Sequence, residues 1–533
     1  MDLFISTILL ATLVKVKKSS TLNQEDKLEK SKLNNGKSAS AVKKGSFLLK
    51  GDEVNTERSL AVNAYLHQLR KKSTSTTGSC SSLNETVGRK LIATREKDMG
   101  PNVSIFYKQD GGLVITSGNG VFMHDIDGND HLDCCNNVAC VGHSHPDVVA
   151  AGCKEMANIQ TNGRFLNPTQ QRYLEKLLAT FPPELNTVYM VNSGSEANDL
   201  ALRIARAHAK VQGQCNRPED VIILDSAYHG HTQALVDISP YKWYQATDGW
   251  NYHPPTTHVV SCPDGYRGRV QLGQTEECGR LYAEEVEQVV RQTGGVGVFI
   301  AESIVGCGGQ IVPPPGYLRR CYAAVRQRGG VCIADEVQTG FARCGTHFWM
   351  FQQHGVVPDI VSMGKPMGNG YPVAAVVVRR EVAQSFAASG IEYFNTYGGN
   401  SVACAIAEAV LDTIKKEKLQ ENALQVGLYL TQQLNDQVKS KYPKWVGDVR
   451  GNGLFQGVEI VQNGSKALIE PYPELTKFLV DHLRYDRIIV SRDGPDENVI
   501  KIKPPLVFSK SNVDLLVSGL LTALDAANSL GVF

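Results

Sequence analysis

The sequence predicts an α/β protein built around a mostly parallel β-sheet. Short apolar runs recur along the middle of the chain, with helical stretches between them. This alternation is typical of parallel sheets whose strands are buried on both faces. Two of these runs, 331–334 and 360–363, end on Asp335-Glu336 and Gly364-Lys365. Because ligands of open α/β sheets bind at the carboxyl ends of the strands, we expect an acid and an amine at one pocket floor.

A carboxylate and an amine placed in this way are the pair that pyridoxal phosphate chemistry needs. Lys365 would form a Schiff base with the aldehyde of the cofactor, and Asp335 would hold the pyridine nitrogen protonated. Each fragment alone also fits a solvated turn or an exposed glycine-rich loop. The hypothesis therefore depends on further motifs along the chain.

Composition excludes several classes of protein. The chain has 533 residues, enough for two to four domains or for one large enzyme with lobes. The net charge of +1 provides no strong field for nucleic acid or a membrane surface. The 13 cysteines lack the spacing of a disulfide scaffold, so reduced thiols in an intracellular protein are expected.

The first 90 residues differ in composition from the rest. An apolar stretch at 3–14 is too short to span a bilayer, and the charges around it do not fit a secretory signal. Mitochondrial and cytoplasmic locations both stay open. Residues 19–90 are rich in Ser, Lys, Asn and Thr, which predicts a disordered or targeting extension over 1–90.

The folded part is expected to begin near residue 91. Residues 121–130 contain an Asp-Gly pair and predict a hairpin with a tight turn. His143 and His145 have no further ligand at metal-site spacing, so no metal site is expected. Arg164 follows a glycine in a loop, where it is either solvated or available to an anionic substrate group.

Two further strand ends carry residues suited to a flat, phosphorylated cofactor. The apolar run 188–191 leads into Ser193-Gly194-Ser195-Glu196 and then into a helical pattern. A strand, a Gly-Ser turn and a helix start offer free backbone N–H groups to a phosphate, although simple capping would leave the same pattern. Tyr228 follows the run 221–224, where it could stack on a ring or lie in the core.

Together these motifs resemble the class III pyridoxal-phosphate-dependent aminotransferases of fold type I. The resemblance covers about residues 91–530, with five motifs in the same order. The matching segments are 192–198 (NSGSEAN), 228–231 (YHGH), 334–341 (ADEVQTGF), 363–366 (MGKP) and 396–400 (TYGGN).

The resemblance implies how the chain is divided. A large cofactor-binding domain with a mostly parallel sheet would span 161–390. A smaller α+β lobe would be built from both chain ends, with its N-terminal segment at 91–160 and a C-terminal lobe at 391–533.

The resemblance also assigns roles around the cofactor ring. Lys365 would be the Schiff-base lysine and proton carrier, and Asp335 would pair with the pyridine nitrogen. Val337 would support one face of the ring, with Tyr228 stacked on the other. Gln338 would approach the ring hydroxyl.

Three more residues are implied at the cofactor phosphate. Gly194 and Ser195 would bind the phosphate of the same subunit's cofactor. Thr396 would reach the phosphate of the neighbouring subunit's cofactor. The implied unit is therefore a homodimer with shared active sites, and a tetramer stays open.

Within the family, the chain looks most similar to the branch of ethanolamine-phosphate and 5-phosphohydroxy-lysine phospho-lyases. The segments that match this branch are 301–303 (AES), 306–310 (GCGGQ), 365–370 (KPMGNG), 392–396 (EYFNT), 493–495 (DGP) and 502–505 (IKPP). Tyr371 and Ser401 depart from the branch, which often has His and Pro there.

Two positions distinguish the chain from the transaminases. Many class III aminotransferases have Glu where Cys307 stands, and many have a carboxylate-gripping Arg where Lys501 stands. Lys and Arg are not equivalent at a bidentate site, and the point charge of Lys501, with Arg164, could hold a substrate phosphate.

The expected substrate is therefore a phosphorylated amine, from which the enzyme would eliminate phosphate and ammonia. One alternative is an alanine–glyoxylate or ω-amino acid aminotransferase, which would share every cofactor residue. Another is a non-catalytic relative that binds pyridoxal phosphate, against which the intact Lys365, Asp335 and Gly194-Ser195 argue. No nucleic acid partner and no membrane span are expected.

Overall fold

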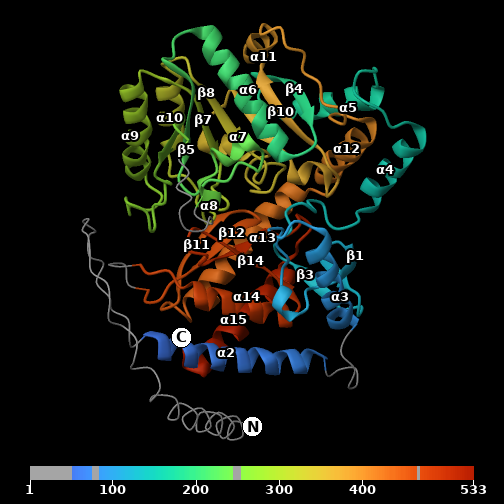
Figure 1. The fold of residues 1–533 in the computed structure, drawn as a ribbon, viewed down its shortest axis with the longest axis vertical. Helices are drawn as coiled ribbons and strands as arrows, with labels where there is room; N and C mark the ends of the chain where they lie inside the picture. The colour runs from blue at the N-terminus through green and yellow to red at the C-terminus, as the bar shows by residue number, and fades with distance from the viewer. Residues whose placement is uncertain (1–50, 75–82, 244–253, 465–468) are drawn as a thin grey trace, which may run out of the picture. The chain divides into compact units, whose positions relative to one another are not determined.

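A seven-stranded sheet forms the centre of the computed structural model, which describes residues 51–74, 83–243, 254–464 and 469–533 (Figure 1). The strand order is β4-β10-β9-β8-β7-β5-β6. Strand β10 is antiparallel to both neighbours, and the other adjacent strands are parallel. The predicted α/β fold with a mostly parallel sheet is thereby confirmed. The strands are β4 (Leu185–Val191), β5 (Arg217–Leu224), β6 (Thr257–Val260), β7 (Val296–Glu302), β8 (Val331–Asp335), β9 (Ile360–Met363) and β10 (Ala374–Arg379).

Alternate side chains of the central strands enter two different apolar clusters. In β8, Val331 and Ile333 pack in the cluster on the side of α6 and α11, whereas Cys332 and Ala334 pack in the cluster on the side of α9 and α10. A strand covered on both faces has no polar face, which explains the uninterrupted apolar runs in the sequence. The four covering helices are α6 (Gly194–Gln212), α9 (Glu276–Thr293), α10 (Tyr317–Arg326) and α11 (Arg380–Ala387).

The register of the parallel strands places polar residues next to one another at one edge of the sheet. Glu302 at the end of β7 pairs with Asp335 at the end of β8, and Asp335 pairs with Ser362 of β9. Lys365 follows β9 after one residue, Gly364. The expectation that an acid and an amine meet at one edge is therefore fulfilled by the strand order.

Two four-stranded sheets build the rest of the fold. In one, β13 from the C-terminal part pairs in parallel with β3, so both ends of the chain contribute to it. The predicted hairpin is also present: β2 and β3 are antiparallel, and Gly128 in their turn has a φ of +81°. The strands are β1 (Ile115–Asn119), β2 (Phe122–Asp125), β3 (Asp130–Asp133) and β13 (Ile488–Ile489), then β11 (Val446–Asn452), β12 (Phe455–Ile460), β14 (Ser491–Asp493) and β15 (Val499–Ile502).

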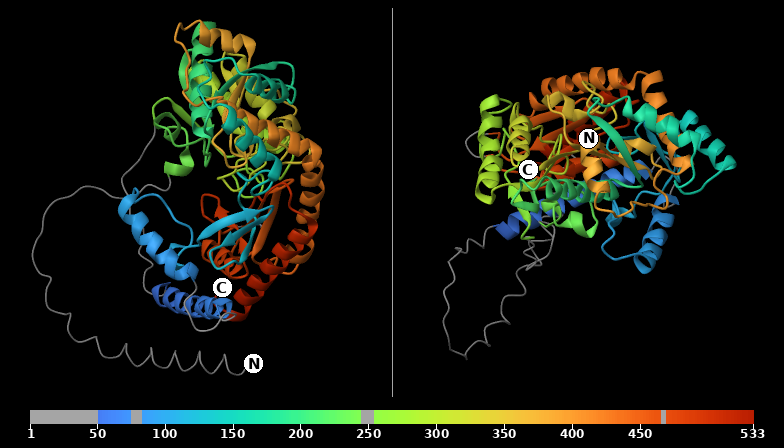
Figure 2. Two further views of the ribbon diagram at one scale, coloured as in Figure 1. Left: turned by 90° about the vertical axis from the view of Figure 1, so that its right-hand side faces the viewer. Right: turned by 90° about the horizontal axis from the view of Figure 1, so that it is seen from above.

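Helices join the large sheet to the C-terminal strands. Figures 1 and 2 show α12 and α13, in orange, leading from the large sheet toward β11 and β12. Helix α15 is apolar and long enough to cross a membrane by length and composition alone, but it packs on α13 and α14 as a core helix does. These helices are α4 (Pro146–Asn158), α5 (Pro168–Leu178), α12 (Ser401–Lys416), α13 (Leu419–Gln433), α14 (Pro473–Tyr485) and α15 (Lys510–Leu530), with short α7 (Gln233–Val236) and α8 (Pro240–Trp243).

The predicted disordered extension over 1–90 is wrong for two of its segments. Gly51–Thr74 forms helix α2 and Leu83–Asp98 forms helix α3. The polar composition hid one apolar side of α2, where Val62, Tyr65 and Leu66 pack against the core. Residues 57–533 form one compact unit, so the fold begins well before residue 91. The stretch 1–20, on which the question of targeting depends, lies outside the described residues.

Hydrogen bonds between the Asn84 side chain and backbone atoms hold helix α3, and composition alone does not predict them. The side-chain oxygen of Asn84 accepts a hydrogen bond from Val114 N at 2.7 Å, and its amide donates to Gly112 O at 3.3 Å. A Cβ on Gly88 would lie 2.0 Å from Gly111 O, so this glycine allows the helix to approach the loop. Specific hydrogen bonds therefore order a segment with little apolar surface.

We expect Tyr65→Ala to loosen α2 without affecting the rest of the fold. The Tyr65 hydroxyl lies 3.1 Å from His482 Nε2, and its ring stacks on the imidazole at 5.8 Å. Loss of both contacts should cost about 1–3 kcal/mol of local stability and speed amide exchange over α2. His67→Ala, at an exposed site of the same helix, is the control. Equal exchange in both variants would contradict the docking of α2.

Candidate active site

Asp335 occupies the floor of the candidate site with its side chain almost fully buried, at 4% exposure. Its Oδ2 lies 2.8 Å from His229 Nδ1 and accepts a hydrogen bond from Asn198 Nδ2 at 2.8 Å. Its Oδ1 accepts from Val337 N at 3.1 Å. Three contacts hold the carboxylate in one orientation, which a buried charge requires. Sequence reasoning assigned no role to His229 or Asn198, although both lie in the motifs that it singled out.

Lys365 begins a short helical turn directly after β9. Its side chain is half-buried, and within the described residues its amine has no ion-pair partner. The preceding Gly364 allows a close approach to the start of α6, because a Cβ there would lie 3.2 Å from Gly194 N. The structure therefore brings an amine free of any described ion pair to the edge of the sheet where Asp335 lies.

The start of α6 forms a cradle for an anion. Ser193 caps the helix by accepting Glu196 N at 3.1 Å, which leaves the N–H groups of Gly194 and Ser195 at the first turn. A Cβ on Gly194 would lie 2.7 Å from Val337 Cγ1. Gly230 has a φ of +136°, and a Cβ there would lie 2.7 Å from Ser195 Oγ. The two glycines keep this end of the helix open, as a bound phosphate needs.

Tyr228 and Val337 lie at the carboxyl ends of β5 and β8. Val337 is 7% exposed and packs against Gly194, whereas Tyr228 is half-buried. Burial raises the pKa of Tyr228 to about 12, so its hydroxyl is neutral near pH 7. An aliphatic group and a neutral aromatic ring suit the two faces of a flat ring.

Gln338 bridges two buried charged groups that the sequence prediction missed. Its Oε1 accepts from Lys503 Nζ at 2.7 Å, and its Nε2 donates to Glu302 Oε2 at 3.4 Å. Burial, and then the charge of Asp335, raises the pKa of Glu302 to about 7. Burial, and then Lys501, lowers the pKa of Lys503 to about 7. Two features of the sequence could have indicated these groups: Glu302 ends an apolar run, and Lys503 lies two residues after Lys501.

Lys501 is a charged group held in place by an acid. Its Nζ lies 2.8 Å from Asp493 Oδ2, which also accepts from Gln310 Nε2 at 3.1 Å. Burial opposes the charge of Lys501, but Asp493 more than offsets this effect and raises its pKa. The neighbouring Cys307 is neutral, because burial, and then Asp493, raises its pKa to about 12. The lysine therefore stays cationic beside a thiol without charge.

Arg164 and Thr396 lie apart from these residues. Arg164 is exposed, pairs with Glu392 at 3.2 Å and lies 3.9 Å over the ring of Phe394. Thr396 is exposed on the segment of Glu392 and Phe394, which lies between α11 and α12. No contact among the described residues joins Arg164 to Lys501, so their joint role at a substrate phosphate stays a prediction.

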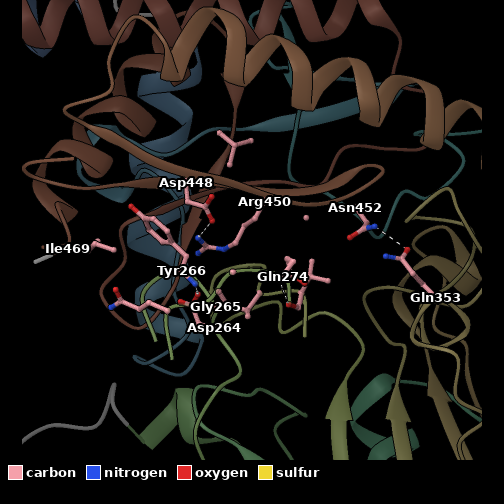
Figure 3. Close-up of a pocket in the computed structure, with 15 residues that line it drawn as sticks. Asp264, Gly265, Tyr266, Gln274, Gln353, Asp448, Arg450, Asn452 and Ile469 are labelled. Atoms are coloured by element: carbon pink, nitrogen blue, oxygen red, sulfur yellow. Dashed lines mark hydrogen bonds and ion pairs between the residues drawn. The ribbon is translucent and has the colours of Figure 1, made fainter. Parts of the chain in front are cut away.

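A separate cavity of about 770 Å³ contains none of the predicted site residues (Figure 3). Arg450 points into it, but its charge is countered by Asp448 at 3.1 Å and Glu459 at 2.5 Å. Its Nε donates to Gly309 O at 2.7 Å, which ties the cavity wall to the glycine-rich loop. We therefore place the chemistry at the strand edge and not in this cavity.

The histidines considered as metal ligands are paired with carboxylates. His143 Nε2 lies 2.8 Å from Asp133 Oδ2, and His145 Nε2 lies 3.0 Å from Glu417 Oε1. Over the described parts of the chain, no group of three or more His, Cys, Asp or Glu side chains could hold a metal ion. The described cysteines are all free thiols.

The sheet topology, the buried acid, the lysine after β9 and the anion cradle define a pyridoxal-phosphate enzyme of fold type I. The family model for class-III aminotransferases matches residues 106–524, and the chain belongs to this family. Its cofactor is pyridoxal 5′-phosphate. The residues present fit the group, because the glycine-lined helix start suits its phosphate and Asp335 suits a cationic ring nitrogen.

Relatives with two kinds of name resemble the chain. It is 46% identical over 442 residues to "alanine–glyoxylate aminotransferase 2-like" of Drosophila melanogaster, covering 82% of this chain and 87% of that protein. It is 38% identical over 471 residues to "ethanolamine-phosphate phospho-lyase homolog 1" of Caenorhabditis elegans, covering 85% and 97%. A solved phospholyase from Arthrobacter, in complex with phosphoethanolamine, has 35% identity and a TM-score of 0.74, covering 82% and 99%.

We expect the two buried lysines to affect stability in opposite directions as pH changes. The pKa of Lys503 is lowered on folding, so its burial costs stability below about pH 7, and this cost fades as pH rises toward its unfolded value of roughly 10.4. Lys503→Met should therefore stabilise the cofactor-free protein by about 1–4 kcal/mol at pH 6, and less at pH 10.

Lys501→Met is the matched control. The pKa of Lys501 is raised on folding, so its contribution is present below about pH 10 and is lost only above. This variant leaves Asp493 buried without its cation and should destabilise the protein at pH 6 and 8. Chemical unfolding at pH 6, 8 and 10 measures both effects. Shifts of the same sign at pH 6 would contradict the assignment of charges.

Proposed function

We propose that this class-III enzyme is a phospho-lyase that eliminates phosphate and ammonia from a phosphorylated amine. Ethanolamine phosphate, giving acetaldehyde, and 5-phosphohydroxy-lysine are the two candidate substrates. The names of the phospho-lyase relative and of the phosphoethanolamine-bound structure support this proposal. The observation in this chain that carries it is the cation Lys501, held by Asp493 beside a neutral Cys307.

The charge pattern around Lys501 favours a phosphate over a carboxylate. An arginine grips a carboxylate through two parallel hydrogen bonds, whereas a lysine acts as a point charge toward a phosphate. Asp493 already lies 2.8 Å from Lys501, so a second carboxylate at position 307 would repel a phosphate there, whereas the neutral thiol of Cys307 does not. Gly494 N donates to Cys307 O at 3.0 Å, which fixes this loop beside the strand pair that carries Lys501 and Asp493.

We assign the cofactor to the residues gathered at the strand edge. Gly194 and Ser195 would bind its phosphate, Asp335 its ring nitrogen and Lys365 its aldehyde. The ring would lie between Val337 and Tyr228, with Gln338 at the ring hydroxyl. When bound, pyridoxal phosphate supplies an aldehyde that takes up the substrate amine and a ring that accepts an electron pair.

The chain's own groups would carry the proton and hold the leaving group. Lys365 would remove a proton from the carbon that bears the nitrogen. Lys501 holds the phosphate on the adjacent carbon, so that its C–O bond can break as the proton leaves. Addition of one water then balances the reaction, with acetaldehyde, ammonia and phosphate formed from phosphoethanolamine.

We also propose that the active unit is a homodimer. Apolar side chains are exposed on the two adjoining segments 159–166 and 391–397, which contact each other through Arg164 and Glu392 at 3.2 Å. Leu166 has 103% exposure, as expected for a residue that another subunit covers. Thr396 lies on this surface, from which it would reach the phosphate of the partner's cofactor.

A class-III aminotransferase is the second candidate function. The fruit-fly relative carries such a name, and every residue that we assign to the cofactor serves both reactions. A transaminase would pass the amino group to a keto acid and would release no phosphate. The two functions therefore differ in their requirement for an acceptor.

The decisive measurement is phosphate release by the purified enzyme loaded with pyridoxal phosphate. With phosphoethanolamine or phosphohydroxylysine as the only substrate, and no keto acid, we expect equal amounts of phosphate and ammonia. Lys365→Ala should reduce the rate by at least about 10³-fold, because it removes the proton carrier. Amino transfer that requires pyruvate or glyoxylate, without phosphate release, would establish the aminotransferase instead.

Mixed dimers test the shared site. A subunit with Thr396→Asp would repel the cofactor phosphate of its partner's site, whereas a subunit with Lys365→Ala is inactive in its own site. In a mixed dimer both changes fall on the same site, so the other site should be intact. Mixing the two inactive variants under subunit exchange should restore roughly a quarter of the activity, since half of random dimers are mixed. Lys365→Ala mixed with Asp335→Asn is the control and should restore none. Equal recovery in both mixtures would contradict the role of Thr396.

A further inference from the structure

The carboxamide of Gln338 lies between two charged side chains that belong to different parts of the chain. Lys503 follows β15 in the C-terminal part, and Glu302 ends β7 of the large sheet. Their exposures are 3% for Lys503, 7% for Gln338 and 3% for Glu302, so water competes little for these contacts. A fixed amide beside the proposed cofactor residues therefore depends on a lysine far away in the sequence.

The chemistry of lysine decides which way this amide points. The ammonium form of Lys503 has only donors, and at 2.7 Å it donates to the amide oxygen of Gln338. The amide NH2 is thereby turned toward Glu302, whose Oε2 accepts at 3.4 Å. Ionised Glu302 and protonated Lys503 specify the same orientation, because a flipped amide would place two acceptors together at one end and two donors at the other.

Neighbouring groups pack closely around both ends of this bridge. A Cβ on Gly306 would lie 2.8 Å from Gln338 Nε2 and 3.1 Å from Glu302 Oε2, so a side chain at this position would push these two groups out of place. On the other side, Lys503 Nζ lies 4.9 Å from the ring centroid of Phe455, and Lys503 N donates to Cys134 O at 2.7 Å. Both ends of the bridge are held in place.

We propose that Lys503 is a positioning residue that acts through Gln338. It fixes the carboxamide so that the NH2, and not the oxygen, faces Glu302, which pairs with Asp335 at the edge where we place the cofactor. The proposal deepens the proposed function, because it rests on Gln338 meeting the ring hydroxyl of pyridoxal phosphate. It does not depend on whether the substrate carries a phosphate.

An NH2 group presented to the ring hydroxyl position has a definite chemical effect. A donor there stabilises the oxygen in its ionised form, whereas an amide oxygen would require the hydroxyl to keep its proton. Lys503 thereby sets the protonation of the bound cofactor without touching it. The absorbance of the cofactor, followed against pH, reports this protonation in the absence of any substrate.

Lys503 has a neighbour that serves as a matched control. Lys501 lies two positions earlier, in β15, so its removal also takes one cation from the site. It pairs with Asp493, and no described contact joins it to Gln338. A general effect of lost positive charge would follow both lysines, whereas an effect through the carboxamide would follow only Lys503.

The experiment uses the full-length enzyme loaded with pyridoxal phosphate. The variants are Lys503→Met, Gln338→Leu, the double variant and Lys501→Met. Cofactor absorbance is titrated between pH 6 and 9 without substrate, and kcat and KM are then measured with phosphoethanolamine. Thermal unfolding of each holoenzyme confirms that the fold persists.

We expect Lys503→Met to shift the pH midpoint of the absorbance change upward and to lower kcat roughly tenfold, as loss of an orienting neighbour does, with little change in KM. Gln338→Leu should have the same effects. The double variant should resemble Gln338→Leu alone, because Lys503 acts only through that amide. Lys501→Met should raise KM for phosphoethanolamine, and its midpoint should move by less than that of Lys503→Met.

Two results would overturn the proposal. One is an equal effect of Lys503→Met with and without Gln338, which would show that the lysine acts on its own. The other is a raised KM with an unchanged absorbance midpoint, which would make Lys503 part of the substrate phosphate site. Because the absorbance titration contains no substrate, an enzyme that proves to be an aminotransferase would leave this test intact.

Discussion

The carboxylate of Asp335 lies at the end of β8 with almost no contact with solvent. A buried charge is tolerated only where hydrogen bonds replace water, and here His229, Asn198 and the backbone of Val337 do so. These partners come from the loop after β5, from α6 and from the turn after β8. The position of one carboxylate thus requires the strand order of the whole sheet.

A second feature of the site is that acids and lysines alternate around Asp335. Glu302 lies on the adjacent strand, where two carboxylates side by side cannot easily both be ionised. Burial and Asp335 accordingly raise the pKa of Glu302 to about 7. Lys503 faces it across the Gln338 amide, and Lys501 is held separately by Asp493. Lys501 in β15 therefore stays cationic near neutral pH, whereas Lys503, just after the strand, loses part of its charge there.

The surface of the single chain fits the homodimer that we propose. Arg164 and Thr396 are exposed, and apolar side chains such as Phe165 and Leu166 surround them without a described partner. An exposed apolar surface of this kind is typical of a face that another protein covers. The residues that we assign to the floor of the cofactor site, by contrast, belong to one chain. In our proposal the partner completes the site but does not build its floor.

The sequence by itself determined the fold class and the residues at the strand ends. Buried parallel strands need apolar side chains on both faces, so their runs and their terminal residues, Asp335 and Lys365, are visible in the amino-acid order. The glycines and serines of the α6 turn were visible because backbone geometry restricts the residues allowed there. Helix α2 escaped prediction, since only one side of it is apolar within a polar stretch.

Only the tertiary structure decided which buried groups face one another. The bridge from Lys503 through Gln338 to Glu302 joins residues that are 165 and 36 positions apart, and no local pattern encodes such a contact. The pairing of Lys501 with Asp493 depends in the same way on the register of β14 and β15. Side-chain charge follows from burial and neighbours, which are properties of the packed chain and not of its order.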